Sequence, residues 1–197
     1  YRADAERRQL RETSVDLDSY LASLEMTLTI AHNEEVDIAR AAQLCQRTNQ
    51  FNLTTRRHRE DDIRGFTRDQ RHDVMLFGLS DRLGNLGNIG LAILRHEGDE
   101  AILDTLLMSC RAVGRQVEQA MLAECARVAQ ARKARRFAAR YEPTAKNGLV
   151  SNLLTGLGVA VARDAKGSQE IRAGLDELRL AAPAFLKIKR QPEPVSA

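Results

Sequence analysis

Aromatic residues are scarce in this sequence: they make up 4% of its 197 residues, and there is no tryptophan. The core must therefore be built mostly from Leu, Ile, Val and Ala. Proteins that bind nucleic acid usually combine a basic stripe with aromatic side chains that stack on bases. With few aromatics and a net charge of only +3, the composition does not indicate a nucleic-acid partner. The mild positive charge instead suits an anionic ligand or an acidic partner protein.

Long apolar runs are also missing. No stretch approaches the roughly 20 apolar residues of a membrane-spanning helix, and no signal peptide is visible, so we expect no membrane partner. Apolar residues at 43% and charged residues at 29% are typical of a globular domain. The sequence opens with Tyr1 inside a charged helical pattern, and we expect further chain before it.

Cysteine is rare, and the three present are Cys45, Cys110 and Cys125. Their number is odd and their spacing is not that of a metal site, so we predict no bound metal and a reducing, cytoplasmic setting. Cys45 and Cys125 fall on apolar helix faces, which is typical of buried small side chains. Cys110 differs because it stands between an apolar strand pattern and a basic turn.

The order of predicted elements indicates a mixed α/β fold with a mostly antiparallel central sheet flanked by helices. Three strand patterns joined by short turns, between residues 74 and 108, imply an antiparallel meander. The first hairpin loop is predicted over residues 81–88. A strand–helix–strand crossover follows, and it joins parallel strands and leaves a crevice at their C-terminal ends. Residues 150–157 are predicted as a short helix.

Three regions are expected along the chain. Residues 1–25 are predicted as an N-terminal helical linker or extension. Residues 26–190 are predicted as the folded domain. Residues 191–197 contain two prolines and are predicted as a disordered tail.

Residues 103–118 form the most informative stretch. An apolar strand pattern ends at Ser109-Cys110, a basic turn with Gly114 follows, and then a long amphipathic helix begins. This geometry aims free backbone N–H groups and a positive dipole end at the turn. Arg111 and that helix end favour a thiolate at Cys110, which nucleophilic catalysis needs. Burial of Cys110 as a packing residue is the alternative interpretation.

Residues 48–57 break the helical period and are dense in amides and hydroxyls. Such a loop is often a plain connector built from Asx turns. Its length and its final pair, Arg56 and Arg57, also suit ligand recognition, and these two with Arg111 and Arg115 are candidates for holding a phosphate. The general base stays open: by residue type, the candidates are His32, His58, His72, His96 and Glu142.

The order of elements resembles the GNAT acyltransferase fold, in which the loop between the fourth strand and the next helix binds pantetheine pyrophosphate through backbone N–H groups. The usual pattern of that loop is Arg/Gln-x-x-Gly-x-Gly/Ala. Here Arg111 and Gly114 match, whereas Gln116 stands in place of the final small residue.

Longer strings are similar to the C-terminal half of the FkbH-like proteins. They are Gln43-Leu44 with residues 48–57, residues 104–105 and 109–111 with Gly114-Arg115, and residues 143–147. The resemblance covers about residues 5–190. On this basis the sequence is identified as a GNAT-like domain of that family.

In that family a HAD-type phosphatase half precedes the GNAT-like half. Together they take a three-carbon unit from 1,3-bisphosphoglycerate, remove phosphate and load glycerate onto an acyl carrier protein in polyketide biosynthesis. The resemblance therefore implies an acyltransferase without a cofactor of its own, with a phosphopantetheine or CoA thiol as the substrate arm. The implied partners are an acyl carrier protein and a HAD-type phosphatase, in the parent chain or in trans. The nucleophile loop of the phosphatase, an Asp-x-Asp that follows an apolar strand, is absent from this sequence, since its one Asp-x-Asp string, Asp16-Leu17-Asp18, follows a charged stretch.

The resemblance also implies the site. Cys110 would carry the acyl group as a thioester. The implied substrate and pantetheine residues are Arg111, Gly114, Arg115, Asn49, Gln50, Asn52, Thr54, Arg56, Lys146 and Asn147. A second interpretation of Lys146 and Asn147 is that they cap the following helix.

The sequence departs from the FkbH-like pattern at several positions. An acid is usual where Asn85 stands, Gly where Gln116 stands, Tyr where His58 stands, and Phe-Tyr where Leu153-Leu154 stand. These changes leave open a domain without activity that docks a carrier protein. A separate alternative is a GNAT acyltransferase that uses acyl-CoA directly.

Overall fold

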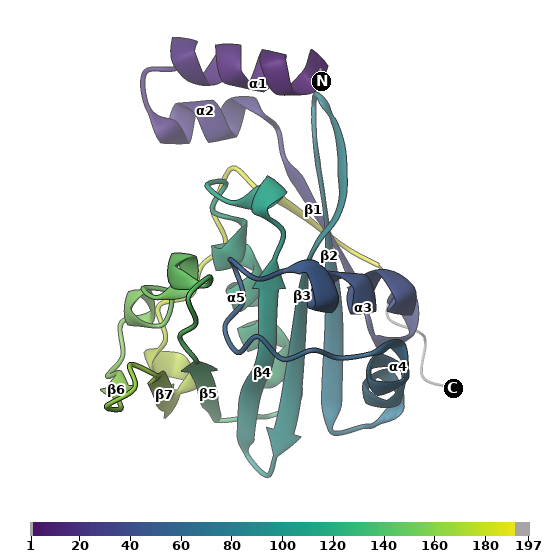
Figure 1. Cartoon of the computed structure of the whole chain (residues 1–197), viewed down its shortest axis with the longest axis vertical. Helices are drawn as coiled ribbons and strands as arrows, with labels where there is room; N and C mark the ends of the chain where they lie inside the picture. The colour runs from purple at the N-terminus through teal and green to yellow at the C-terminus, as the bar shows by residue number, and fades with distance from the viewer. Residues whose placement is uncertain (1, 192–197) are drawn as a thin grey trace.

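The computed structural model describes residues 2–191 of the chain. A single eight-stranded sheet forms the centre of this part (Figure 1). Its strand order is β6-β7-β5-β4-β3-β2-β1-β8. The strands are β1 (Thr27–His32), β2 (His72–Asp81), β3 (Gly84–Glu97), β4 (Glu100–Met108), β5 (Arg136–Tyr141), β6 (Ala162–Arg163), β7 (Gln169–Gly174) and β8 (Lys187–Arg190). Only the β4–β5 and β1–β8 pairs are parallel within these residues, so the predicted mixed and mostly antiparallel sheet is confirmed.

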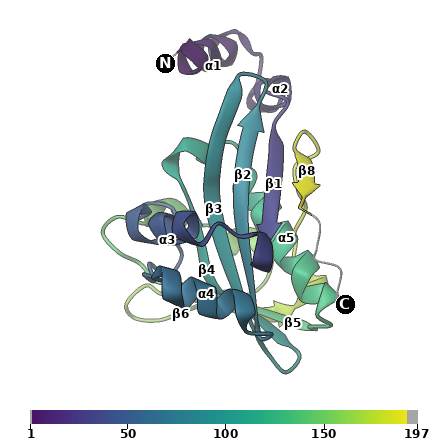
Figure 2. The same ribbon diagram turned by 90° about the vertical axis from the view of Figure 1, so that its right-hand side faces the viewer.

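Helices cover both faces of the sheet. Figure 2 shows α3 and α4 on one face and α5 on the other. The α-helices are α1 (Arg2–Thr13), α2 (Leu17–Ser23), α3 (Ile38–Arg47), α4 (Glu60–Arg68) and α5 (Val117–Ala131). Short 3-10 helices are η1 (Asn33–Glu35), η2 (Cys110–Ala112), η3 (Gly148–Val150), η4 (Thr155–Leu157) and η5 (Leu175–Glu177). None of the helices within residues 2–191 has the length and apolar content needed to cross a membrane.

Aliphatic side chains fill two cores, one on each side of the sheet. Leu44 and Cys45 of α3 belong to the core that faces α4, and Met121 and Cys125 of α5 belong to the other. Gly90 of β3 allows α5 to approach, since a Cβ there would lie 2.7 Å from the Met121 methyl group. Both buried cysteines thus have the packing role that their helix faces predict.

Two local predictions were wrong. The β2–β3 hairpin turn is only Arg82-Leu83, and residues 84–88 belong to β3 because backbone pairing continues through two β-bulges. The helix predicted over residues 150–157 is replaced by the 3-10 turns η3 and η4. That segment contains Gly156 and is too short to repay the cost of nucleating an α-helix.

The two N-terminal helices lie beyond one end of the sheet, beside the tip of the β2–β3 hairpin (Figures 1 and 2). Asp16 caps α2 by accepting a hydrogen bond from the backbone N–H of Ser19 at 2.8 Å. Arg7 of α1 makes a two-point contact with the buried carboxylate of Asp81, at 2.8 and 2.9 Å. The predicted C-terminal tail, apart from Gln191, lies outside the described residues.

The parallel strands β4 and β5 pair only over their first halves, residues 100–103 with 136–139. Beyond that point the chain segment 51–53 takes the place of β5 beside β4. The backbone N–H of Leu53 donates to Leu106 at 3.0 Å, and that of Met108 donates to Phe51 at 2.9 Å. Glu142, just after β5, donates to Leu53 at 2.9 Å. The loop after α3 is therefore held at the end of β4, where the predicted crevice lies.

Candidate functional site

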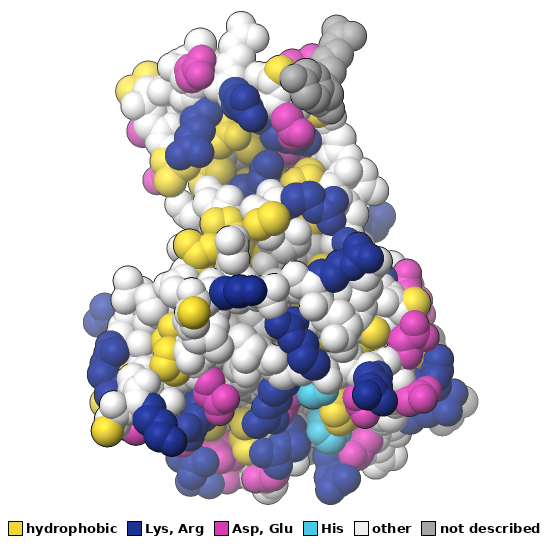
Figure 3. All heavy atoms as spheres, in the orientation of Figure 1, with side chains coloured by type: hydrophobic (Ala, Val, Ile, Leu, Met, Phe, Trp, Pro, Cys, Tyr) yellow, Lys and Arg dark blue, Asp and Glu magenta, His cyan; other side chains and the backbone are white. Residues whose placement is uncertain are grey.

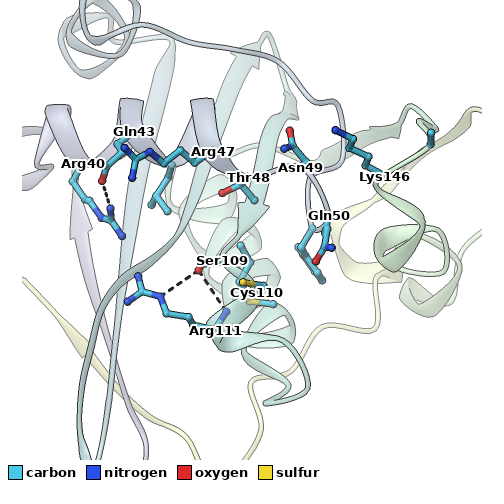
Figure 4. A pocket seen from close by; sticks show the side chains of 14 residues that line it. Arg40, Gln43, Arg47, Thr48, Asn49, Gln50, Ser109, Cys110, Arg111 and Lys146 are labelled. Atoms are coloured by element: carbon cyan, nitrogen blue, oxygen red, sulfur yellow. Dashed lines mark hydrogen bonds between the residues drawn. The ribbon is translucent and has the colours of Figure 1, made fainter. Parts of the chain in front are cut away.

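A cavity of about 790 Å³ opens between α3 and the segment that follows β4. In Figure 4, Arg40, Gln43 and Arg47 come from α3, and Ser109 and Cys110 come from the segment that follows β4. The lining residues are Arg40, Gln43, Leu44, Arg47, Thr48, Asn49, Gln50, Phe51, Met108, Ser109, Cys110, Arg111, Ala145 and Lys146. Among them are Asn49, Gln50, Cys110, Arg111 and Lys146, which the sequence predicts as site residues.

The cavity is cationic. Arg40, Arg47, Arg111 and Lys146 line it, and none of its lining residues is an Asp or Glu. Within residues 2–191, none of these four cations makes an ion pair: Arg40 donates to Gln43 and to the backbone oxygen of Asn88, and Arg111 donates to the Ser109 hydroxyl. Figure 3 shows Lys and Arg side chains spread over this face. Four cations without carboxylate partners suit a ligand that carries phosphate.

Cys110 is the exposed thiol of the three. It lies in η2, whose preceding residue Ser109 accepts a hydrogen bond from the Arg111 backbone N–H at 3.5 Å. Burial raises the pKa of Cys45 to about 11 and raises the pKa of Cys125 further. Only Cys110 therefore combines access to a ligand with a position on the cavity wall.

Asn52 and Asn147, both predicted as substrate contacts, lie outside the cavity and are fully buried. Asn52 donates to the backbone oxygen of Thr48 at 3.1 Å and accepts from the Thr55 backbone N–H at 2.9 Å. Asn147 donates to the backbone oxygens of Asn52 and Glu142, each at 2.9 Å. The two amides hold the loop that carries Asn49 and Gln50 against the turn that carries Lys146.

Thr54 and Arg56 also lie outside the cavity. The Thr54 hydroxyl donates to the backbone oxygen of Asp104 at 3.0 Å. Arg56 pairs with the Asp104 carboxylate. Burial alone would raise the pKa of that carboxyl, but the contacts from His58 and Arg56 outweigh burial and lower it. In this arrangement Arg56 is already paired with an anion.

The turn between η2 and α5 contains two residues with left-handed backbone, and its two arginines have different partners. Gly114 and Gln116 both adopt left-handed conformations, with φ values of 78° and 58°. Arg115 turns away from the cavity and pairs with the buried Asp81 at 3.4 Å. It also donates to the Arg111 backbone oxygen at 3.3 Å. Arg111 faces the cavity and Arg115 secures the turn.

The four histidines lie elsewhere in the described part of the chain, since none lines the cavity. His32 and His96 each hydrogen-bond the buried carboxylate of Asp73 at 2.7 Å, and Arg132 pairs with it at 3.0 Å. Burial would raise the pKa of Asp73, but these three contacts outweigh it and hold the pKa far below its usual value. This cluster anchors β1, β2, β3 and the end of α5 to one another. No group of three or more His, Cys, Asp or Glu within residues 2–191 could hold a metal ion.

Sequence reasoning missed Arg40 and Arg47. Both belong to α3, and its apolar residues, such as Ala41 and Cys45, predict only which face of the helix is buried. A signal was present, because Arg40, Gln43 and Arg47 follow one another at spacings of three and four and must share a helix face. The sequence does not show that this face lines a cavity, because the cavity forms only when residues 51–53 of the following loop pair with β4.

No family model and no curated protein matches the sequence. Its structure is similar to solved GNAT proteins. The ribosomal-protein-S18-alanine N-acetyltransferase from Escherichia coli aligns with a TM-score of 0.53 at 18% identity, over 75% of this chain and 94% of that one. N-acetylglutamate synthase from Neisseria gonorrhoeae, complexed with coenzyme A and N-acetyl-glutamate, aligns with a TM-score of 0.54 at 15% identity, over 75% and 35%. The GNAT domain of S. lividans PAT aligns with 0.50 at 22%, over 70% and 85%.

These alignments establish the GNAT fold that the order of elements predicts. At such identities they establish the fold alone.

Proposed function

We propose that this domain transfers an acyl group from an acyl phosphate to the thiol of a carrier protein's phosphopantetheine arm, through a thioester on Cys110. The observation that carries the proposal is one exposed thiol on the wall of a cavity with four unpaired cations. An acyl phosphate has the two features that such a cavity recognises. Its phosphate suits the cations, and its carbonyl carbon is open to attack by a thiolate.

The reaction takes two steps. In the first, the Cys110 thiolate attacks the carbonyl carbon, a C–S bond forms, and the C–O bond to the phosphate breaks. Arg111 and its neighbours offset the charge on the departing phosphate. In the second, the thiolate of the arm attacks the thioester, and the Cys110 thiolate is released. No electrons are gained or lost overall, and the proton of the arm's thiol ends on the phosphate.

The acyl group that we propose is a glyceryl-type three-carbon unit from 1,3-bisphosphoglycerate. A HAD-type phosphatase, as a domain of the parent chain or a separate protein, would remove the remaining phosphate ester with water. Support comes from the three strings that resemble FkbH-like proteins, because parts of each of them, residues 48–51, 109–111 and 145–146, line the cavity. A cytoplasmic setting and a role in polyketide biosynthesis belong to the same proposal.

A second candidate is direct transfer from acyl-CoA without an enzyme thioester. The observation that favours it is the fold itself, since N-acetylglutamate synthase, with a TM-score of 0.54, is complexed with coenzyme A. Under this alternative Cys110 only lines the cavity. Its replacement would then leave the rate of transfer unchanged.

Loading of a carrier protein distinguishes the two candidates. The chain, a phosphatase of the HAD type, holo-carrier protein and 1,3-bisphosphoglycerate are incubated together, and the carrier is measured by intact mass spectrometry. We expect a glyceryl adduct with the wild type and none with Cys110→Ala. Cys45→Ala removes a thiol outside the cavity and serves as the control. Full loading by Cys110→Ala would contradict the covalent role.

A further inference from the structure

Arg57 is one of the predicted candidates for holding a phosphate, but it does not line the cationic cavity. Its guanidinium group donates to the backbone oxygens of Cys45 and Thr48, the second at 3.2 Å, and to the side-chain oxygen of Asn49. Cys45 and Thr48 stand at the C-terminal end of α3, where free carbonyl groups attract a cation. Within residues 2–191, Asn49 is the one side chain that Arg57 contacts by a hydrogen bond, and Asn49 lines the cavity.

The contact with Arg57 fixes the direction of the Asn49 amide. A guanidinium group has only N–H donors and no acceptor, so the atom of the amide that faces it must be the oxygen. The nitrogen, Nδ2, donates to no group within the described part of the chain. Because Asn49 is partly exposed on the cavity wall, its N–H groups are available to a ligand.

Gln43 of α3 is arranged in the same way. Its side-chain oxygen accepts a hydrogen bond from Arg40, and its Nε2 atom has no acceptor within residues 2–191. In Figure 4, Gln43 and Arg40 lie on one side of the cavity, and Asn49 and Lys146 lie on the other. Two amides of the wall therefore have their oxygens occupied by guanidinium groups and their N–H groups free. Such a wall suits a ligand with several acceptor oxygens, as a phosphate group has.

From these contacts we infer that Arg57 is a positioning residue, which holds Asn49 so that its amide donates to a phosphate oxygen of the bound acyl donor. The inference deepens the function proposed above and rests on it for the identity of the ligand. Arg57 itself touches no ligand and acts through Asn49. Without Arg57 the amide can rotate and present its oxygen, an acceptor, to the anion.

Calorimetry with pyrophosphate as the probe tests this inference on the wild type, Asn49→Ala, Arg57→Met and the double variant. Asn49→Ala should weaken binding about fivefold, because one hydrogen bond to a charged acceptor is lost. Arg57→Met should weaken binding to the wild type about threefold more than Arg59→Met does. In the Asn49→Ala background, the two arginine variants should have equal effects, because no amide is left to position. Arg59 is exposed in the same loop, lies outside the cavity and matches the change in charge.

Asn49→Asp gives a second test that does not require Arg57 to be removed. One oxygen of the new carboxylate keeps the contact with Arg57, so the melting temperature should not fall. The other oxygen takes the place of Nδ2 and repels the probe. The affinity for pyrophosphate should therefore fall at least about tenfold, further than in Asn49→Ala.

Several results would overturn the inference. Equal losses from Arg57→Met with and without the Asn49 amide would mean that Arg57 supports only the end of α3. Wild-type affinity in Asn49→Ala or in Asn49→Asp, or no binding of pyrophosphate to the wild type, would exclude Asn49 as a donor to the ligand. Because neither an acyl donor nor a carrier protein is present, these outcomes are independent of whether the loading assay succeeds.

Discussion

The side-chain amide of Asn147 donates a hydrogen bond to the backbone oxygen of Asn52 at 2.9 Å, and this contact joins two segments that are 95 residues apart. The same amide group also donates to Glu142, and its oxygen accepts from the Thr144 backbone N–H at 2.7 Å. One buried side chain therefore satisfies backbone groups of both the loop after α3 and the turn after β5. These two segments form one wall of the cationic cavity.

Replacing Asn147 with alanine should destabilise the fold. The change leaves the buried backbone groups of Asn52 and Glu142 without partners, at a cost of about 2–3 kcal/mol in the free energy of unfolding. For a chain of this size the melting temperature should fall by roughly 5–10 °C. Asn152→Ala, at an exposed position, is the control and should change it little. Equal melting temperatures for Asn147→Ala and the wild type would show that the bridge contributes nothing.

The Asp73 cluster should make stability depend on pH. The pKa of the Asp73 carboxyl is lowered in the folded chain. Its contribution to the free energy of unfolding is therefore complete above the pKa of an unfolded Asp, about 4, and is lost as the pH falls below that pKa. Asp73→Asn should lower the free energy of unfolding by about 2–3 kcal/mol near neutral pH. This is less than the loss expected when a fully buried ion pair is broken, because the Arg132 side chain is partly exposed to solvent.

Urea unfolding at several pH values measures this effect. The difference in the free energy of unfolding between the wild type and Asp73→Asn should be constant above about pH 5 and should shrink below about pH 4. Asp61→Asn, on the exposed side of α4, should show no such trend. A difference that grows as the pH falls would have the wrong sign for a carboxyl group with a lowered pKa.

The cations of the first cavity should bind phosphate together. Replacing Arg40 or Arg47 with alanine should weaken the binding of pyrophosphate, used as a probe, by about five- to tenfold each. The wild-type affinity should also fall as salt rises, because the cavity is open to solvent. Calorimetry at low and moderate salt measures both effects. Arg8→Ala, exposed on α1, serves as the control, and an equal loss there would mean that overall charge rather than the cavity binds the probe.

Thiol alkylation should distinguish the three cysteines. Iodoacetamide should add one carbamidomethyl group to the folded chain, on Cys110, because Cys45 and Cys125 are buried and their pKa values are raised. All three should react in denaturant. Mass spectrometry of peptides identifies the sites. Labelling of Cys125 before Cys110 in the folded chain would contradict the burial described for α5.

The sequence was sufficient to predict most of the fold. Continuous apolar runs joined by short turns predicted the meander, and the apolar faces of α3 and α5 correctly predicted that Cys45 and Cys125 are buried. The errors were local. Residues 84–88 are strand although their pattern is that of a turn, because backbone hydrogen bonds to β2 hold them whatever their side chains are.

The site was harder to predict, because residue type does not reveal a partner. Asn49 and Asn52 look alike in the sequence, yet only Asn49 lines the cavity, while Asn52 satisfies buried backbone groups. Likewise Arg111 faces the cavity and Arg115 pairs with Asp81, a residue more than 30 positions away. Which arginine is available to a ligand depends on such long-range pairs.

Acylation of Cys110 is the step on which the proposed function depends, and peptide mass spectrometry of the chain can detect it without a carrier protein. The chain is mixed with 1,3-bisphosphoglycerate without any carrier protein, quenched in acid, and digested. We predict a phosphoglyceryl adduct on the peptide that contains Cys110, released by hydroxylamine as a thioester should be, and absent from Cys110→Ala. An adduct of equal yield on Cys110→Ala, or carrier loading by a wild-type chain that never becomes acylated, would exclude Cys110 as the residue that carries the acyl group.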